Sequence, residues 1–218
     1  MEAISLTKDN YDTLDELFEE WEKAHENDKY YEKTFPSCPC CGVMPTEEFK
    51  TSFTYDGFLS GNEGIKLLFI GRESNATDKI KKEKELDKNF WMRKVWDGEI
   101  NGKEANNYKS YLTKIREYFK CENDACAYMN INKRGGYSQC DYTRLDNYVA
   151  VYSEFIKKEI ELIGPEIIVF LGVGKYKYRE KLRDIIKNID KNIKCYEVYH
   201  PSAPGKESKL EEKLNNEI

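Results

Sequence analysis

The sequence predicts an α/β fold with a central, mainly parallel sheet of four strands. Four short apolar runs, at residues 64–71, 127–131, 166–171 and 194–199, alternate with segments of helical pattern. This alternation is typical of parallel sheets, because a crossover helix joins each strand to the next. The chain has 218 residues, enough for one full-sized domain, and we see no linker that would divide it.

Each predicted element has its own local pattern. The run at residues 64–71 is continuously apolar and bounded by glycines, which is the pattern of a strand buried on both faces. Apolar residues recur at three- and four-residue spacing over residues 11–31 and over 145–163, where Gly164-Pro165 ends the second helix. We expect residues 1–60 to form a helical, cysteine-containing extension that packs on the core.

Composition and charge exclude several classes of protein. Hydrophobic residues make up 39% of the chain and charged residues 34%, as expected of a globular protein with a solvated surface. No run of about 18 apolar residues could span a membrane, and the N-terminus lacks the basic and apolar regions of a signal peptide. We therefore expect a cytoplasmic monomer that makes no membrane contact. The net charge of -5 gives no general attraction to nucleic acid, so any binding of DNA must be local.

Seven cysteines in such a chain are expected to stay reduced rather than to form disulfides. Cys38 and Cys41 form a C-x-x-C-G knuckle, a turn that is frequent in zinc and iron sites. Two further ligands are needed: Cys126 and Cys140 are our choice, with Cys121 and His25 as alternatives. Buried free thiols are the leading expectation; if the cysteines bind metal, we expect a structural zinc ahead of a 4Fe–4S cluster.

Polar residues follow each predicted strand. Because the carboxyl ends of parallel strands meet at one edge, we expect residues 71–75, 130–136, 172–175 and 200–202 to lie close together. His200 is one of only two histidines, and the proline after it restricts it to extended backbone, which holds its imidazole at a strand end. The segment from Gly172 to Lys175 is not a phosphate-binding loop, since it lacks the four-residue gap and the Ser or Thr that such a loop needs.

These motifs together resemble the uracil-DNA glycosylase superfamily, in the family's order, over about residues 64–206. The four blocks are Gly71-Arg72-Glu73 after the first strand, Asn130 at the second, Ile-Glu-Leu-Ile-Gly-Pro-Glu-Ile-Ile-Val-Phe-Leu-Gly at residues 160–172, and His200-Pro201-Ser202. The third block is most similar to the thermophile-type, iron–sulfur branch. An acid two residues after Gly71 is more similar to the branch that has an aspartate there.

The resemblance implies a three-layer α/β/α sandwich that hydrolyses the bond between a base and its deoxyribose, on a nucleotide flipped out of the DNA stack. His200 is then a donor that stabilises negative charge on the departing base. Glu73 is a carboxylate that orients water and offsets positive charge on the sugar. Asn130 presents a donor and an acceptor to the base. The chemistry requires no cofactor.

Further contacts with DNA follow from the same resemblance. The base-binding residues are Gly71, Arg72 and Phe90, with Trp91 and Trp96 as alternatives to Phe90 for stacking on the base. The loop from Ser202 to Gly205 is expected to press into the duplex, with Ala203 and Pro204 as an apolar wedge. The remaining expected contacts, most of them in a glycine-rich loop suited to phosphate, are Asn75, Asn132, Lys133, Arg134 and Gly135.

Several alternatives stay open at this point. Ser74-Asn75 stands where the family commonly has a proline, which leaves open the base that is recognised. Taken singly, Glu73 could cap a helix, Asn130 could be a core amide satisfied by backbone, and Asn132 could form a turn. Two other functions are a member of the fold that binds nucleic acid or a modified nucleotide without cleaving it, and an interaction protein stapled by metal at the cysteine knuckle.

Overall fold

The computed structural model describes residues 2–34, 37, 53–61, 64–75, 91–121, 124–136 and 140–218. A five-stranded sheet has the order β1-β3-β2-β4-β5, with β1 antiparallel to β3 and all other neighbours parallel. The strands are β1 Gly57–Ser60, β2 Leu67–Asn75, β3 Cys126–Gly136, β4 Ile167–Leu171 and β5 Lys194–Val198. The α/β class and the mainly parallel sheet are confirmed, and the number of strands is corrected from four to five.

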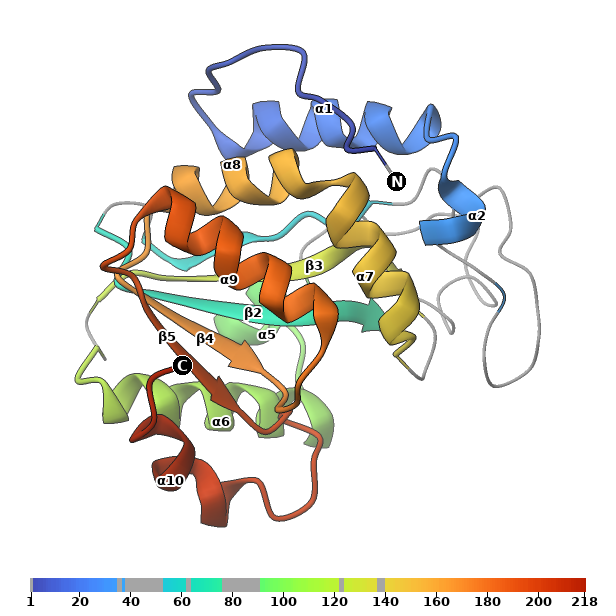
Figure 1. Cartoon of the computed structure of the whole chain (residues 1–218). Coiled ribbons are helices and arrows are strands. Elements are labelled where there is room, and N and C mark those ends of the chain that lie inside the picture. The colour runs from blue at the N-terminus through green and yellow to red at the C-terminus, as the bar shows by residue number, and fades with distance from the viewer. Residues whose placement is uncertain are drawn as a thin grey trace.

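Helices cover both faces of this sheet (Figure 1). One face carries α1, α7, α8 and α9, and the other carries α5, α6 and α10. The bounds are α1 Leu14–Glu26, α2 Tyr31–Thr34, α5 Trp91–Asp97, α6 Lys103–Tyr118, α7 Tyr142–Val151, α8 Ser153–Ile163, α9 Lys177–Ile189, the 3₁₀ turn Glu207–Lys209 and α10 Leu210–Leu214. Within the described residues, no helix has the length and apolar character needed to cross a bilayer.

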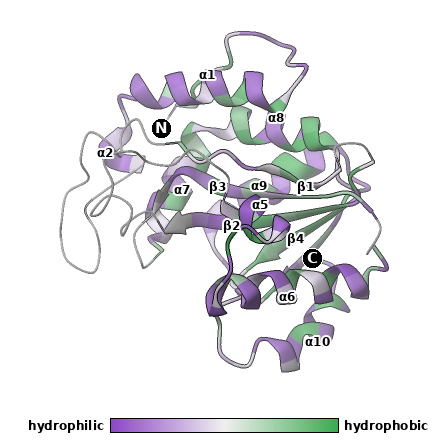
Figure 2. Ribbon diagram, turned by 180° about the vertical axis from the view of Figure 1, so that it is seen from behind, coloured by the Kyte–Doolittle hydropathy of each residue, from purple (hydrophilic) through white to green (hydrophobic). Residues whose placement is uncertain are grey.

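The two faces of the sheet have separate hydrophobic cores. Leu68 and Ile70 of β2 pack with the core on the α1 and α8 side, whereas Leu67 and Phe69 pack with the core on the α6 and α10 side. This alternation follows from the two-residue period of a strand, and it explains why β2 is apolar throughout rather than at every second residue. Figure 2 shows the hydrophobic residues concentrated on the central strands and on α8, which covers them.

The fifth strand, β1, lies in the segment that we expected to be part of the N-terminal extension. It has only four residues, begins at Gly57 and pairs with β3 through an irregular register between Phe58 and Ser60. A strand this short offers too few residues for an alternating pattern to be recognised in the sequence. It forms because β3 presents an open edge to it.

The predicted glycine-rich loop at residues 132–136 is instead the second half of β3. β2 also continues past Gly71, so that Glu73 pairs with Asn132 and Asn75 pairs with Gly136. The ladder of the parallel neighbour therefore overrides the loop tendency of the two glycines. The predicted helix over residues 145–163 is also divided, since Tyr152 leaves helical geometry between α7 and α8.

The strand order places a topological switch point between β2 and β4. The chain leaves β2 toward β3 on one side of the sheet, and it leaves β4 toward β5 on the other. The crevice at the carboxyl ends of such diverging strands is the usual ligand site of open α/β sheets. Three of the segments that we singled out, after β2, β4 and β5, lie around this point.

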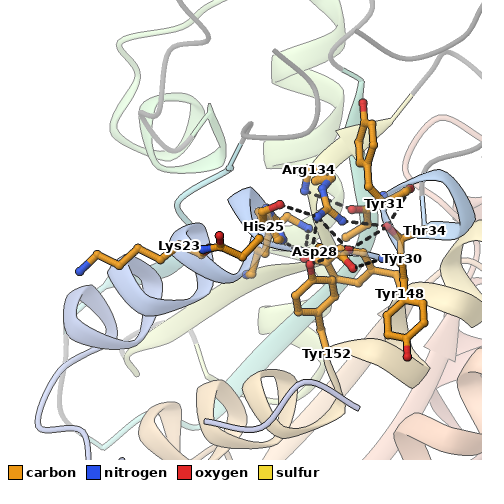
Figure 3. A network of polar contacts seen from close by, with 12 residues as sticks. Lys23, His25, Asp28, Tyr30, Tyr31, Thr34, Arg134, Tyr148 and Tyr152 are labelled. Atoms are coloured by element: carbon orange, nitrogen blue, oxygen red, sulfur yellow. Dashed lines mark hydrogen bonds and ion pairs between the residues drawn. The ribbon is translucent and has the colours of Figure 1, made fainter. Parts of the chain in front are cut away.

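Arg134 is buried in a polar network that ties α1 and α2 to β3, rather than exposed for contact with phosphate (Figure 3). Its guanidinium lies 3.0 Å from Asp28 Oδ2 and donates to the hydroxyls of Thr34 and Tyr152, each at 2.9 Å. Tyr152 in turn donates to Asp28 at 2.9 Å. The expected phosphate contact of Arg134 is therefore wrong, because a side chain that is 1% exposed cannot reach a phosphate.

Lys133 is also wrong as a phosphate contact, since it is 0% exposed. Its Nζ donates to Asp56 and to Glu159 of α8, both at 2.7 Å, and lies over the rings of Phe18 and Trp21. Two carboxylates and two aromatic rings thus replace the water that the ammonium loses on burial. We call Lys133, Asp56 and Glu159 the buried charge cluster.

Replacing Lys133 by Met is expected to destabilise the fold by about 3–5 kcal/mol, because Asp56 and Glu159 would stay buried without their cation. Urea unfolding followed by circular dichroism measures this change. Lys175→Met is the matched control, because Lys175 is exposed, and its effect should stay within about 0.5 kcal/mol. Equal midpoints for the two variants would show that the cluster does not stabilise the protein.

Candidate active site

His200 lies two residues beyond β5 and is held by contacts at both ring nitrogens. The backbone N–H of Ser202 donates to its Nδ1 at 3.2 Å, and its Nε2 lies 2.8 Å from the hydroxyl of Tyr108 on α6. Since Nδ1 accepts a hydrogen bond, the proton of the neutral ring is on Nε2, which donates to Tyr108. The strand end thus presents a neutral imidazole in a fixed tautomer.

The surroundings of His200 keep it neutral. Burial, followed by the positive charges of Arg72 and Lys206, lowers the pKa of His200 to about 4. At neutral pH the ring therefore donates a hydrogen bond but holds no proton for transfer as an acid. A neutral donor of this kind suits the stabilisation of charge that develops on a ligand oxygen.

Arg72 extends from β2 toward the loop that follows β4. Its Nη1 donates to the hydroxyl of Tyr142 at 2.7 Å, and a Cβ at Gly172 would lie 3.8 Å from its guanidinium. Gly172 has φ +128, a conformation that other residues rarely adopt. Arg179 of α9 donates to the Gly172 carbonyl and, at 2.6 Å, to Glu197 of β5. Arg72 is therefore placed at the switch point beside a loop that the protein fixes in position.

Glu73 points into a buried polar environment at the end of β2. Its carboxylate forms an ion pair with Arg144 of α7 and accepts from Asn132 Nδ2 at 3.1 Å. Gly136 leaves room for it, because a Cβ there would overlap the Glu73 side chain. Burial raises the pKa of Glu73 above its ordinary value of 4.5, and Arg144 and Asn132 oppose that rise. The environment thus favours a carboxyl that can take up a proton.

Asn130 is held in one orientation by Asp56. The Asn130 backbone N–H donates to Asp56 Oδ2 at 2.5 Å, and its Nδ2 donates to Asp56 Oδ1 at 3.3 Å. The amide oxygen accepts from the Tyr128 hydroxyl at 3.5 Å and faces Gly71, where a Cβ would lie 2.9 Å away. Gly71 is therefore required for the close approach of Asn130, and the buried charge cluster continues directly into this part of the site.

The structure brings Arg72 into electrostatic range of both His200 and Glu73. Its charge lowers the pKa of His200 and opposes the rise in the pKa of Glu73. His200 and Glu73 have different partners: Tyr108 and Ser202 contact His200, whereas Arg144 and Asn132 contact Glu73. The candidate site thus combines the cation Arg72, the neutral hydrogen-bond donor His200 and the buried carboxylate Glu73.

The remaining expected site residues differ in where they lie. Ser202 and Pro204 are exposed and Ala203 is half-buried, as a surface loop requires. Asn132 is 0% exposed, so its expected contact with DNA is wrong, and its amide supports Glu73 instead. Phe90 lies outside the described residues, and the structure does not describe the side chain of Asn75 or the exposure of Gly135.

The proposed set of four cysteine ligands is not compatible with the structure. Cys126 begins β3 and contacts Ser60, whereas Cys140 lies beyond the far end of the same strand. A strand of 11 residues rises roughly 3.3 Å per residue, so these two sulfurs cannot bind one metal ion. Cys38 and Cys41 lie outside the described residues, and within the described ones no three His, Cys, Asp or Glu side chains group as a metal site.

Sequence reasoning missed four residues of the site: Asp56, Tyr108, Tyr128 and Arg144. Nothing in the local pattern distinguishes Tyr108 from Tyr111 of the same helix, and a lone arginine in a helix, as Arg144 is in α7, is most often a surface residue. Asp56 is 74 residues away from its partner Asn130 in the sequence, so only the fold brings the two together. The alternation of Tyr128 and Asn130 on one face of a strand was the single signal that could have been used.

No family model matches this chain, and no curated protein matches it. The functional interpretation therefore depends on the geometry of the site itself.

Replacing Arg144 by Met should destabilise the protein by about 3–5 kcal/mol at pH 8 and by clearly less at pH 5. Without its cation, the pKa of Glu73 rises further, and protonation at lower pH removes the unpaired charge. Urea unfolding at the two pH values measures the difference. Lys181→Met, which breaks an ion pair with Asp146 at the surface, is the control and should show no such pH dependence. An equal loss at pH 5 and pH 8 would show that Glu73 does not titrate in response.

Proposed function

We propose that this protein is a DNA glycosylase-like hydrolase that cleaves the N-glycosidic bond of a deaminated or otherwise modified base flipped out of DNA. The observation that carries the proposal is the neutral, Nε2-protonated His200 beside Arg72 at the switch point of the sheet. A buried carboxylate, Glu73, lies on the same strand as that arginine. The covering of the sheet by helices on both faces supports a three-layer, uracil-DNA glycosylase-like arrangement.

We assign each group one step of the proposed reaction. As the bond between C1′ and the base nitrogen breaks, its electron pair moves to the base, and negative charge gathers on a base oxygen. The neutral donor at His200 and the charge of Arg72 stabilise that oxygen more strongly in the transition state than in the substrate. Water forms the new bond to C1′, and its proton passes to Glu73, whose raised pKa suits a general base. Atoms and charges then balance without a cofactor.

Recognition of the base and of DNA falls to different parts of the site. The fixed amide of Asn130 offers its oxygen and its remaining N–H to the edge of the base. The exposed loop at Ser202 to Pro204 is the part that would contact the duplex. Lys133 and Arg134 take no part in this binding, so the affinity for DNA should depend on salt less steeply than in proteins with many phosphate contacts.

A member of the fold that binds a modified nucleotide without cleaving it is the second candidate. One observation favours it: the carboxylate of Glu73 is occupied by Arg144 and Asn132. A carboxylate that is held by both partners could orient a water molecule only if one of those contacts loosened when the nucleotide bound. The assay that tests the first proposal separates the two.

Labelled oligonucleotides that carry uracil, hypoxanthine, xanthine or a modified cytosine, followed by alkaline cleavage at abasic sites, test the activity. We expect at least one base to be removed, and His200→Ala to slow its removal by about 10²–10³-fold, as the loss of a fixed donor does elsewhere. Arg93→Gln, which changes an exposed arginine of α5, is the control and should leave the rate unchanged. Binding without cleavage of any base would support the second candidate instead.

The rate should rise with pH across the acidic range and then reach a plateau. Glu73 must be ionised to accept a proton, and its pKa lies above 4.5, whereas His200 is already neutral above about pH 4. The rise of kcat/KM with pH in the acidic range therefore reports the ionisation of Glu73. Glu73→Gln should be slow at every pH and should not show this rise. A falling rate between pH 5 and pH 7 would contradict the neutral donor and indicate that protonated His200 acts as an acid.

A further inference from the structure

The hydroxyl of Tyr108 on α6 lies 2.8 Å from Nε2 of His200, the histidine of the site. We propose that Tyr108 is a further catalytic residue, whose hydroxyl, polarised by His200, hydrogen-bonds the departing base. This inference rests on the proposed function and assigns to it a class of substrate, namely bases that leave with their negative charge on a carbonyl oxygen. In this proposal Tyr108, rather than His200, contacts the leaving group.

The first step of the argument is that the donor of His200 is already in use. Nδ1 accepts from the Ser202 backbone N–H, so the one proton of the neutral ring is on Nε2. That proton points to the Tyr108 oxygen, 2.8 Å away. A base oxygen can take this hydrogen bond directly only if Tyr108 moves aside.

The second step is that Tyr108 has a proton to offer in its place. Burial raises the pKa of Tyr108 to about 12, although a hydrogen bond from Ser202 opposes the rise, so the phenol stays protonated at neutral pH. A phenol oxygen accepts hydrogen bonds while its own O–H donates one. Because the Tyr108 oxygen accepts from His200 Nε2, its O–H is left to donate to another acceptor.

The third step is that the Tyr108 ring is fixed in position. Its edge-to-face contacts with Trp91 and His200 have centroid distances of 5.6 Å and 5.5 Å. The charge of Arg72 contributes, after burial, to the low pKa of His200 and opposes the rise in the pKa of Tyr108. A donor held in this way needs no reorganisation when charge develops, which is the condition for strong stabilisation of a transition state.

The chemistry balances without transfer of the tyrosine proton. The bond from C1′ to the base nitrogen breaks, its electron pair stays with the base, and the Tyr108 O–H donates to the carbonyl oxygen that becomes negative. The chain of donors from His200 to Tyr108 strengthens that hydrogen bond. Uracil, hypoxanthine and xanthine have such an oxygen, and adenine has none. Adenine should therefore not be removed.

Steady-state kinetics of Tyr108→Phe on the best of these bases test the proposal. We expect kcat to fall by about 10²-fold or more with little change in KM, because the lost hydrogen bond strengthens only in the transition state. The double variant with His200→Ala should be little slower than the slower single variant, since the two residues act as one chain. Tyr111→Phe removes a hydroxyl from the same helix and is the control, with no loss expected.

Two results would overturn the proposal. Retained or increased kcat in Tyr108→Phe, beside a large loss in His200→Ala, would show that His200 acts directly and that Tyr108 only covers it. Efficient removal of adenine would contradict the assigned class of substrate.

Nitrogen NMR of the imidazoles separates failure of this proposal from failure of the proposed function. The chain has two histidines, so the signals of His200 are identified by their loss in His200→Ala. We expect the Nε2–H tautomer from pH 5 to pH 9, and a shift of Nε2 in Tyr108→Phe that is absent from Tyr111→Phe. If the wild type removes no base but this shift is seen, the proposed function fails while the hydrogen-bonded pair stands. If the wild type is active and the shift is absent, the proposed role of Tyr108 fails while the proposed function stands.

Discussion

Lys133 brings two carboxylates from distant parts of the chain into the centre of the molecule. Asp56 lies just before the edge strand β1, and Glu159 lies on a helix of the covering layer. Each ion loses its hydration on burial, and the loss is offset only while all three remain together. Because Asp56 also holds the backbone and the amide of Asn130, the position of the site depends on this cluster. A shift of β1 by one residue would break the charge cluster and the site together.

The sequence predicted the α/β class and four of the five strands correctly, because these depend on local patterns of apolar residues, but it ended β2 and β3 too early. It predicted the environment of Lys133 and Arg134 wrongly. Two cations followed by two glycines are typical of an exposed loop, and lysine and arginine are rarely buried. Their acidic partners, Asp56 and Asp28, are 77 and 106 residues away in the sequence. No local pattern reports a pairing over that distance, and Tyr108 escaped notice for the same reason.

Three arginines lie at the carboxyl edge of the sheet of a chain that is acidic as a whole. The net charge is -5, yet Arg72, Arg144 and Arg179 gather at the carboxyl edge of the sheet. Arg144 and Arg179 are paired with Glu73 and Glu197, whereas Arg72 donates to a neutral hydroxyl, so the local excess of positive charge comes from Arg72. The acidic surface is screened within about 8–10 Å at physiological salt, so this one cation can act on a bound ligand at short range. The proposed function would then not require a general affinity for nucleic acid.

Gly136 shows how the backbone of one strand can set the chemistry of another. The space that a methyl group would take there is filled by the carboxyl of Glu73. A side chain at residue 136 would displace that carboxyl, although Gly136 itself carries no charge. Among natural relatives, we expect a change from glycine at this position to occur only together with a change in the orientation or identity of the acid at residue 73.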